Sequence, residues 1–208
     1  MDERGPRHFS MIRGFHLADA FTLVNGFLGA GAVLSFMRFC IDLRVCFFWL
    51  GAALLPLALM MDALDGRIAR RRGVASPLGL ELDSLADVVS FGVAPAAMAF
   101  AAGMRGGWDA LFLIYFVGCG ISRLARYNVT ASTLSGPTGK VTHFEGFPIP
   151  TSLLLVALLS ALARLDHWQD ALPLGAISVA GMTWHPLSVV FGLHGSAMIS
   201  KTLRIPKP

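Results

Sequence analysis

The sequence has 208 residues, of which 55% are hydrophobic and 14% are charged, and its formal net charge is +4 at pH 7. Soluble domains carry about 25% charged residues, so this composition excludes an ordinary water-soluble domain and indicates that lipid surrounds much of the chain. The positive charge forms no basic stripe with interleaved aromatic residues, so we expect no binding of nucleic acid.

Apolar runs of about the length that crosses a bilayer, roughly 17 to 25 residues, recur along nearly the whole sequence. They predict an all-α polytopic membrane protein with about six transmembrane helices in a single domain that covers residues 1–208. The expected spans are 17–37, 44–61, 85–104, 108–121, 150–165 and 172–200, the last interrupted at His185-Pro186. Residues 1–15 carry charge without a small-residue cleavage site, so we expect a cytoplasmic N-terminal segment and no cleaved signal peptide.

The distribution of Lys and Arg predicts the orientation, because these residues accumulate in short loops on the cytoplasmic side. With both termini in the cytoplasm, the inside segments contain 13 of the 17 Lys and Arg residues. The outside segments contain only Arg38, Arg44, Arg105 and Arg164. We therefore expect an N-in/C-in multi-pass topology, with the net positive charge attracted to anionic membrane lipid.

Four aspartates lie in the segment MMDALDGRIARRRGVASPLGLELDSLADVVSFGVAPA, at or near the ends of the second and third expected spans. An ionised Asp at membrane depth costs about 2.5 to 3.5 kcal/mol, so such residues usually face a cavity and serve a function. At about 100° per residue, one broad helix face presents Asp62, Asp65, Gly66, Ala69 and Arg70. The next helix presents on one face Gly79, Asp83 and Asp87. Two acidic faces joined by a short turn can meet.

Divalent cations would relieve the repulsion between four converging carboxylates. Oxygen-only ligands favour Mg²⁺ or Mn²⁺ over Zn²⁺, and none of the four positions is a His or a Cys. Two such ions would clamp a diphosphate and stabilise the charge that develops when its bridge breaks. Gly66 and Gly79 lack side chains, so a nucleotide can lie against the helix backbone there.

The pattern D-x-x-D-G-x-x-A-R-x8-G-x-x-x-D-x-x-x-D is matched at all eight of its specified positions and resembles the signature of CDP-alcohol phosphotransferases. The resemblance implies that metal ions held by the aspartates bind the diphosphate of a CDP-linked lipid, and that CMP leaves as an acceptor hydroxyl attacks. The implied metal ligands are Asp62, Asp65, Asp83 and Asp87, the last also acting as the general base if it reaches the acceptor hydroxyl. The implied contacts to the CDP-lipid come from Asn25, Asp65, Gly66, Ala69, Arg70 and Gly79. The alternative for the aspartates is a structural role, as helix caps or as ion partners of Arg67 and Arg70.

Further segments resemble the bacterial-type phosphatidylserine synthase subfamily, namely GLELDSLADVVSFGVAPA, SRLARYN, HFEGFPIPTS and SKTLRIPKP. This resemblance implies that CDP-diacylglycerol and L-serine are the substrates and that phosphatidylserine and CMP are the products. It also implies a homodimer in the inner (cytoplasmic) membrane, with the active site facing the cytoplasm.

A serine pocket needs at least one cation for the carboxylate and some oxygen acceptors for the ammonium group. Arg123 and Arg126 lie three apart on one helical face and are candidates for the cation, with polar contacts from Asn128 and Glu145. The alternative is that these arginines extend to lipid headgroups. In the first span, FTLVNGFLG resembles the family's Thr-x-x-Asn segment, where Asn25 either contacts nucleotide or packs between helices.

Two other functions are compatible with the same residues. The acceptor alcohol could instead be glycerol 3-phosphate or inositol phosphate, for which a second basic cluster near the site is expected. A cation transporter could carry ions on its intramembrane aspartates. However, the four aspartates gather near the cytoplasmic face, whereas a transport site usually lies near the bilayer midplane between repeats.

Overall fold

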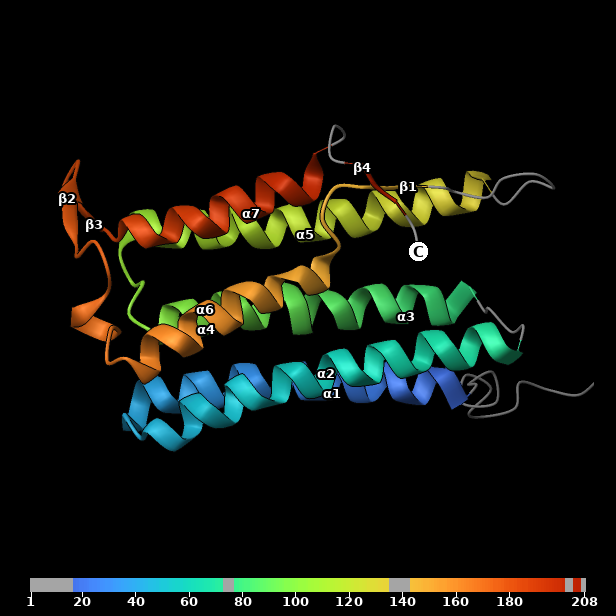
Figure 1. The fold of residues 1–208 in the computed structure, drawn as a ribbon, viewed down its shortest axis with the longest axis horizontal. Helices are drawn as coiled ribbons and strands as arrows, with labels where there is room; N and C mark the ends of the chain where they lie inside the picture. The colour runs from blue at the N-terminus through green and yellow to red at the C-terminus, as the bar shows by residue number, and fades with distance from the viewer. Residues whose placement is uncertain (1–16, 73–76, 135–142, 201–203, 207–208) are drawn as a thin grey trace, which may run out of the picture.

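A bundle of roughly parallel helices forms the protein in the computed structural model, which describes residues 17–72, 77–134, 143–200 and 204–206 (Figure 1). The α-helices are α1 (Leu17–Asp42), α2 (Val45–Arg72), α3 (Pro77–Asp87), α4 (Ala94–Ala101), α5 (Gly107–Leu134), α6 (Leu153–Arg164) and α7 (Val189–Ile199). A π-helix, η2 (Val88–Val93), joins α3 to α4 without a break. Short 3₁₀ turns are η3 (Ile149–Ser152), η4 (Gln169–Ala171) and η5 (Pro186–Ser188).

Four short strands form two antiparallel pairs. Strand β1 (His143–Glu145) pairs with β4 (Arg204–Pro206), and β2 (Ile177–Val179) pairs with β3 (Met182–Trp184). The β2–β3 hairpin lies at one end of the bundle, which we call the far end (Figure 1). The last turn of α2 and the first turn of α3 lie at the opposite end, which we call the near end (Figure 1).

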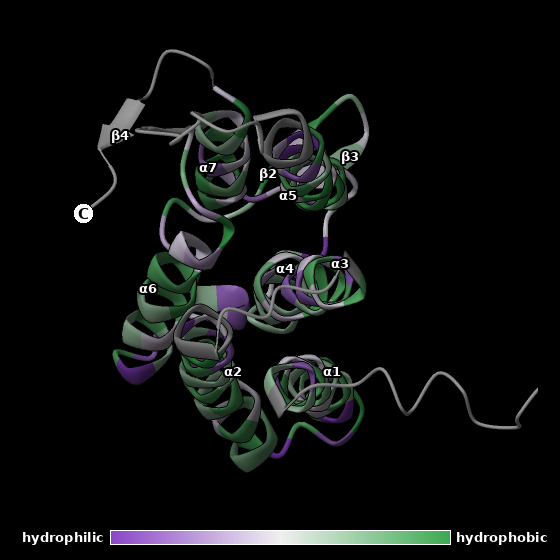
Figure 2. Ribbon diagram, turned by 90° about the vertical axis from the view of Figure 1, so that its right-hand side faces the viewer, coloured by the Kyte–Doolittle hydropathy of each residue, from purple (hydrophilic) through white to green (hydrophobic). Residues whose placement is uncertain are grey.

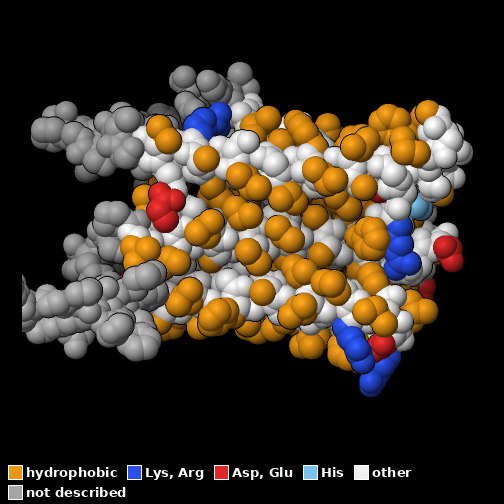
Figure 3. Space-filling model, turned by 180° about the vertical axis from the view of Figure 1, so that it is seen from behind, with side chains coloured by type: hydrophobic (Ala, Val, Ile, Leu, Met, Phe, Trp, Pro, Cys, Tyr) orange, Lys and Arg blue, Asp and Glu red, His pale blue; other side chains and the backbone are white. Residues whose placement is uncertain are grey.

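Four helical segments are long and apolar enough to cross a membrane: Ala18–Asp42, Val45–Ile68, Leu78–Ala101 and Gly107–Val129. Two shorter apolar helices are Ile149–Arg164 and Pro186–Ile199. Hydrophobic side chains cover the middle of the face drawn in Figure 3, and the charged ones lie toward its two ends. These features confirm an all-α polytopic membrane protein, while the number of spans and their orientation remain predictions.

The helix bounds differ from the expected spans, most of all in the sixth. The expected sixth span, 172–200, is a hairpin over much of its first half, because Gly175 and Gly181 adopt φ values of +63° and +78°, which a helix does not contain. Helix begins again only at Pro186, where the missing N–H of proline is tolerated. The third span is helical from Pro77, well before the expected residue 85, and the fourth continues to Leu134, beyond 121.

The continuous segment α3–η2–α4 occupies the middle of the bundle. It contacts α1 on one side, α5 on another and, through α4, also α6 (Figure 2). Large apolar side chains fill the core of the bundle, among them the fully buried Phe36, Phe48, Phe91, Phe116 and Met98. The central position of this segment means that residues at the end of α3 are reached by side chains from several neighbouring helices.

Candidate metal and substrate site

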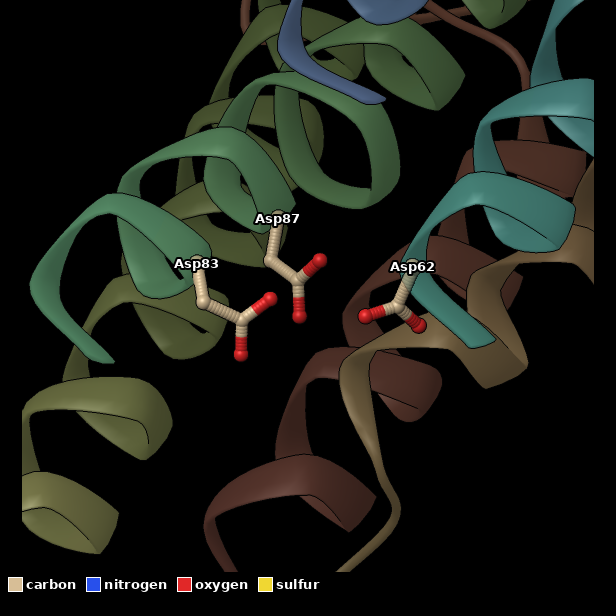
Figure 4. Close-up of side chains that lie close together, drawn as sticks. All are labelled: Asp62, Asp83 and Asp87. Carbon is tan, nitrogen blue, oxygen red and sulfur yellow. The ribbon is translucent and has the colours of Figure 1, made fainter. Parts of the chain in front are cut away.

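Three carboxylates from two helices converge beside the central segment. Asp62 projects from α2, and Asp83 and Asp87 project from successive turns of α3, so that the three carboxyl groups face one another (Figure 4). One oxygen from each lies within 4.8 Å of the other two. The i, i+4 spacing of Asp83 and Asp87 accounts for their shared face, and the antiparallel return of α3 along α2 brings that face to Asp62.

The carboxylates lie inside the bundle and not at its surface. Asp62 comes ten residues before the end of α2 at Arg72, and Asp87 comes ten residues after the start of α3 at Pro77. At 1.5 Å per residue, both lie about 15 Å along the helices from the near end. Asp87 is buried, while Asp62 and Asp83 are partly exposed. The site is therefore recessed but open to a ligand.

The three residues suit a hard divalent cation. Their donors are all oxygen atoms, and Oδ1 of Asp83 is buried without a hydrogen-bond partner among the described residues. Two oxygens on opposite sides of Mg²⁺ lie about 4.2 Å apart, because each Mg–O distance is 2.0–2.1 Å. The three oxygens lie within 4.8 Å of one another, so a small closure would bring them to distances that one ion can span.

The fourth aspartate of the motif, Asp65, faces α1. Its Oδ2 accepts a hydrogen bond of 2.8 Å from the hydroxyl of Thr22, and its side chain is buried. The three-carboxylate group in the described part of the chain does not include it. The predicted role of Asp65 as a metal ligand therefore remains a prediction.

Asn25 contacts the acidic cluster directly. Its Nδ2 donates to Oδ1 of Asp87 at 3.2 Å, and its backbone carbonyl accepts a hydrogen bond of 2.9 Å from the Ser90 hydroxyl. Asn25 is completely buried. Asn25 is thus packed between helices and bonded to Asp87, and its contact with nucleotide remains a prediction.

The close approach of α1 to η2 depends on Gly29. A Cβ atom built on Gly29 would lie 2.2 Å from the Ser90 Oγ and 2.7 Å from its Cα. Only glycine leaves room for this contact. The π-helix begins directly after Asp87 and widens the turn that carries Ser90, and π-turns of this kind are frequent at functional sites.

The remaining candidates for nucleotide contact lie near the carboxylates or outside the described side chains. Gly66 follows Asp65 on α2, and Gly79 lies one turn before Asp83 on α3, both partly exposed. The backbone of α2 includes Ala69 and Arg70, but their side chains lie outside what the structure describes.

The predicted serine-binding residues have different surroundings. Arg123 is buried, its guanidinium lies 5.8 Å from the Tyr127 ring centroid, and its charge interacts with that of Asp87. Arg126 instead donates from Nη1 to the carbonyl of Ile199 at the end of α7, at 3.2 Å. Arg123 is thus the arginine of the pair that lies toward the carboxylates.

The other two predicted serine-binding residues, Asn128 and Glu145, have no described contact with the carboxylates. Asn128 donates from Nδ2 to the Ser84 hydroxyl at 3.0 Å, which joins α5 to α3. The backbone of Glu145 pairs with Arg204 across β1 and β4, and the side chain of Glu145 lies outside the described part of the chain.

Sequence reasoning missed two residues that support the site. Thr22 was visible only as part of the Thr-x-x-Asn pattern, and its spacing of three from Asn25 places both on one face of α1. Ser84 belongs to no recognised pattern in the sequence. On a helix, adjacent residues such as Asp83 and Ser84 point in different directions, so nothing in the sequence placed Ser84 at the site. Their partners, Asp65 and Asn128, become apparent only in the packed structure.

Comparison with known proteins agrees with the motif. Residues 15–193 match the family model described as CDP-alcohol phosphatidyltransferase. The chain is 45% identical over 204 residues to the CDP-diacylglycerol–serine O-phosphatidyltransferase of Saccharomyces cerevisiae, covering 97% of this chain and 74% of that protein. Proteins of the same name are 34% identical over 150 residues in Methanocaldococcus jannaschii (71% and 62% covered) and 41% identical over 119 residues in Helicobacter pylori (54% and 46% covered).

The family match includes both acidic helices and most of the membrane bundle. The three carboxylates that face one another in Figure 4 all lie within it. The chain therefore belongs to the CDP-alcohol phosphatidyltransferase family of enzymes.

Proposed function

We propose that this enzyme transfers the phosphatidyl group of CDP-diacylglycerol to L-serine and releases CMP. The observation that carries the proposal is the convergence of Asp62, Asp83 and Asp87 within a membrane bundle. Such a cluster suits the diphosphate of a substrate whose acyl chains remain in lipid. The choice of serine is supported by the names of relatives that cover most of this chain.

The proposed cofactor is Mg²⁺ or Mn²⁺, as two ions held by Asp62, Asp65, Asp83 and Asp87. When bound, the ions would offset the charge of the diphosphate and of the departing CMP. Asp62 and the two aspartates of α3 supply oxygen atoms from opposite sides of the site. Asp65 would join them while its Oδ2 keeps the hydrogen bond from Thr22.

The proposed general base is Asp87. The serine hydroxyl oxygen forms a bond to the phosphatidyl phosphorus as the bond from that phosphorus to the CMP oxygen breaks, and CMP leaves with the electron pair. The hydroxyl proton passes to a carboxylate oxygen of Asp87. Asn25 donates to Oδ1, so the proton would pass to Oδ2, which keeps a second lone pair for the proposed cation.

Arg123 is the proposed cation for the serine carboxylate. It is buried, lies on α5 opposite the acidic helix α3, and its charge interacts with that of Asp87. A serine bound between them would place its carboxylate at the guanidinium and its hydroxyl toward the base. The roles proposed for Arg126, Asn128 and Glu145 are supporting polar contacts at the edge of this pocket.

The CDP moiety is proposed to lie along the helix surfaces at Asn25, Asp65, Gly66, Ala69, Arg70 and Gly79. The two glycines leave the backbones of α2 and α3 accessible beside the carboxylates. Arg70 would pair with phosphate oxygens. We also propose that the near end faces the cytoplasm from the inner membrane, and that two copies of the chain form a homodimer within it.

Incubation of the purified full chain in detergent with CDP-diacylglycerol, labelled L-serine and Mn²⁺ tests the proposal. Labelled phosphatidylserine is expected, together with an equal amount of CMP. A parallel reaction contains labelled glycerol 3-phosphate, and a third contains labelled inositol phosphate. Labelled lipid in either of those reactions and none with serine would assign a different acceptor.

No specific observation favours the alternative function, that of a cation transporter. The carboxylates lie about 15 Å from the near end on the family's diphosphate motif. Family membership accounts for them through group transfer, so ion transport is not proposed.

A further inference from the structure

We propose that α1 acts as a template for the carboxylate site, and that Thr22 and Asn25 are positioning residues that hold Asp65 and Asp87 in place. The inference rests on the proposed metal site, because it concerns the geometry of that site's ligands. It assigns a role to Thr22, and it adds carboxylate positioning to the proposed role of Asn25.

The two residues reach two different acidic helices from one face of α1. Thr22 donates from Oγ1 to Oδ2 of Asp65 on α2, at 2.8 Å. Asn25, three residues further along, donates from Nδ2 to Oδ1 of Asp87 on α3, at 3.2 Å. These hydrogen bonds fix the second and fourth aspartates of the motif, Asp65 and Asp87, relative to one helix. A carboxylate bound at one oxygen has its other oxygen oriented for a cation.

The position of α1 against the site is itself fixed. Ser90, three residues beyond Asp87, donates to the backbone carbonyl of Asn25, and Gly29 allows the two backbones to touch. Ser90 and Asn25 are both completely buried. The distance between Asn25 and Asp87 therefore follows from the packing of α1 on η2 and does not depend on flexible side chains alone.

The burial of Asn25 needs an explanation, because a polar side chain lies in the interior. The residue has no exposed surface, and its Oδ1 makes no hydrogen bond to any part of the chain that the structure describes. A buried amide oxygen without a partner destabilises the fold, so the contact made by the amide nitrogen has to offset that cost. The hydrogen bond to Asp87 is the contact that an apolar side chain would lose.

The test measures Mn²⁺ binding to the purified full chain in detergent, without nucleotide, from the electron paramagnetic resonance signal of free Mn²⁺. Asn25→Ala and Thr22→Val are each expected to weaken Mn²⁺ affinity about 10-fold, as loss of a hydrogen bond to a metal ligand does. Thr22→Ser keeps the hydroxyl and should restore the affinity. The matched control is Ser35→Ala, which removes a buried hydroxyl on α1 whose hydrogen bond among the described residues goes to the carbonyl of Gly31. It should leave Mn²⁺ affinity unchanged.

A double variant shows whether Asn25 acts through Asp87. In an Asp87→Asn background, Asn25→Ala should cause no further loss of Mn²⁺ affinity, because the carboxylate that it orients is gone. An unchanged Mn²⁺ affinity in Asn25→Ala, or the same 10-fold loss in the Asp87→Asn background, would overturn the inference. A wild-type chain that binds no Mn²⁺ would instead refute the proposed metal site, so the two failures are distinguishable.

Discussion

Asn128 on α5 donates a hydrogen bond from Nδ2 to Oγ of Ser84 on α3, at 3.0 Å. Ser84 directly follows Asp83 in the sequence. The pair joins the helix that carries two of the carboxylates to the helix that carries Arg123. A residue proposed to contact serine is thus already engaged by a neighbouring helix. Its contribution to structure and its contribution to substrate binding can be separated experimentally.

Asn128→Ala and Ser84→Ala should lower stability by similar amounts, about 1 kcal/mol each, because each removes the same hydrogen bond. The stability of the double variant should lie within a few tenths of a kcal/mol of the stability of either single variant. Thermal unfolding in detergent measures both effects. If Asn128→Ala raises the KM for serine and Ser84→Ala does not, Asn128 also contacts the substrate.

Arg123→Gln should raise the KM for serine by about 10- to 100-fold, because a charge-assisted hydrogen bond contributes about 1.5 to 3 kcal/mol. The KM for CDP-diacylglycerol should change little. Arg126→Gln is the comparison variant and should raise the KM for serine less, since the Arg126 guanidinium is bonded to the Ile199 carbonyl at the edge of the pocket. Steady-state kinetics with each substrate varied in turn measures the difference. Equal effects of the two variants on the KM for serine would remove Arg123 from its proposed role.

The apolar runs predicted the membrane bundle, but hydropathy could not locate every helix end. Residues 172–185 are apolar enough for a span, yet turns at Gly175 and Gly181 make them a hairpin. The start of the third span was placed too late because polar residues such as Glu81 and Asp83 lower the local hydropathy. Both residues nevertheless lie on α3. Asp83 faces the interior of the site, and Glu81 is exposed.

The spacing of the motif placed Asp83 and Asp87 on one helix face, and it indicated that Asp62 could approach them. Helix periodicity cannot supply contacts between helices distant in sequence, because the axial register of two helices is set by packing. The approach of Gly29 to Ser90 sets that register for α1. It is the reason why Asn25 meets Asp87 and why this contact was not predicted.

Asp87→Asn should reduce turnover by about 10²- to 10⁴-fold, since it removes the proposed general base. Binding of CDP-diacylglycerol should persist, because Asp62, Asp65 and Asp83 remain. Product formation with labelled serine gives the turnover, and equilibrium binding of labelled CDP-diacylglycerol gives the affinity. Turnover close to that of the wild type would show that another group accepts the hydroxyl proton.

Asp109→Ala should destabilise the fold by about 3 kcal/mol while leaving the chemistry intact. Asp109 is completely buried at the far end, where it accepts hydrogen bonds from the backbone N–H groups of Gly106 and His185, each at 2.8 Å. It also lies 2.6 Å from Nδ1 of His185. Removing the carboxylate leaves these donors without their acceptor and loosens the hairpin from α5.

Thermal unfolding measures the loss in Asp109→Ala, and turnover below the unfolding temperature should match the wild type because the carboxylate site lies toward the other end. The control is Asp42→Ala, which breaks a 2.6 Å ion pair with Arg38, whose side chain is largely exposed. Exposed pairs contribute less than about 1 kcal/mol. An Asp42→Ala variant as unstable as Asp109→Ala would show that the buried contacts have no special weight.

Removal of divalent ions with EDTA should lower turnover by about 100-fold or more, since metal ions at a transferring phosphoryl group contribute several kcal/mol. Addition of Mg²⁺ or Mn²⁺ in excess should restore it. Asp83→Asn should weaken Mn²⁺ binding, because Asp83 contributes an oxygen to the three-carboxylate cluster and its buried Oδ1 has no hydrogen-bond partner within the described residues. Glu81→Gln neutralises an exposed carboxylate on the same helix and should not weaken it. Equal losses in both variants would mean that Mn²⁺ responds to the overall charge of α3 and not to the cluster, and full activity in EDTA would exclude a metal-dependent reaction.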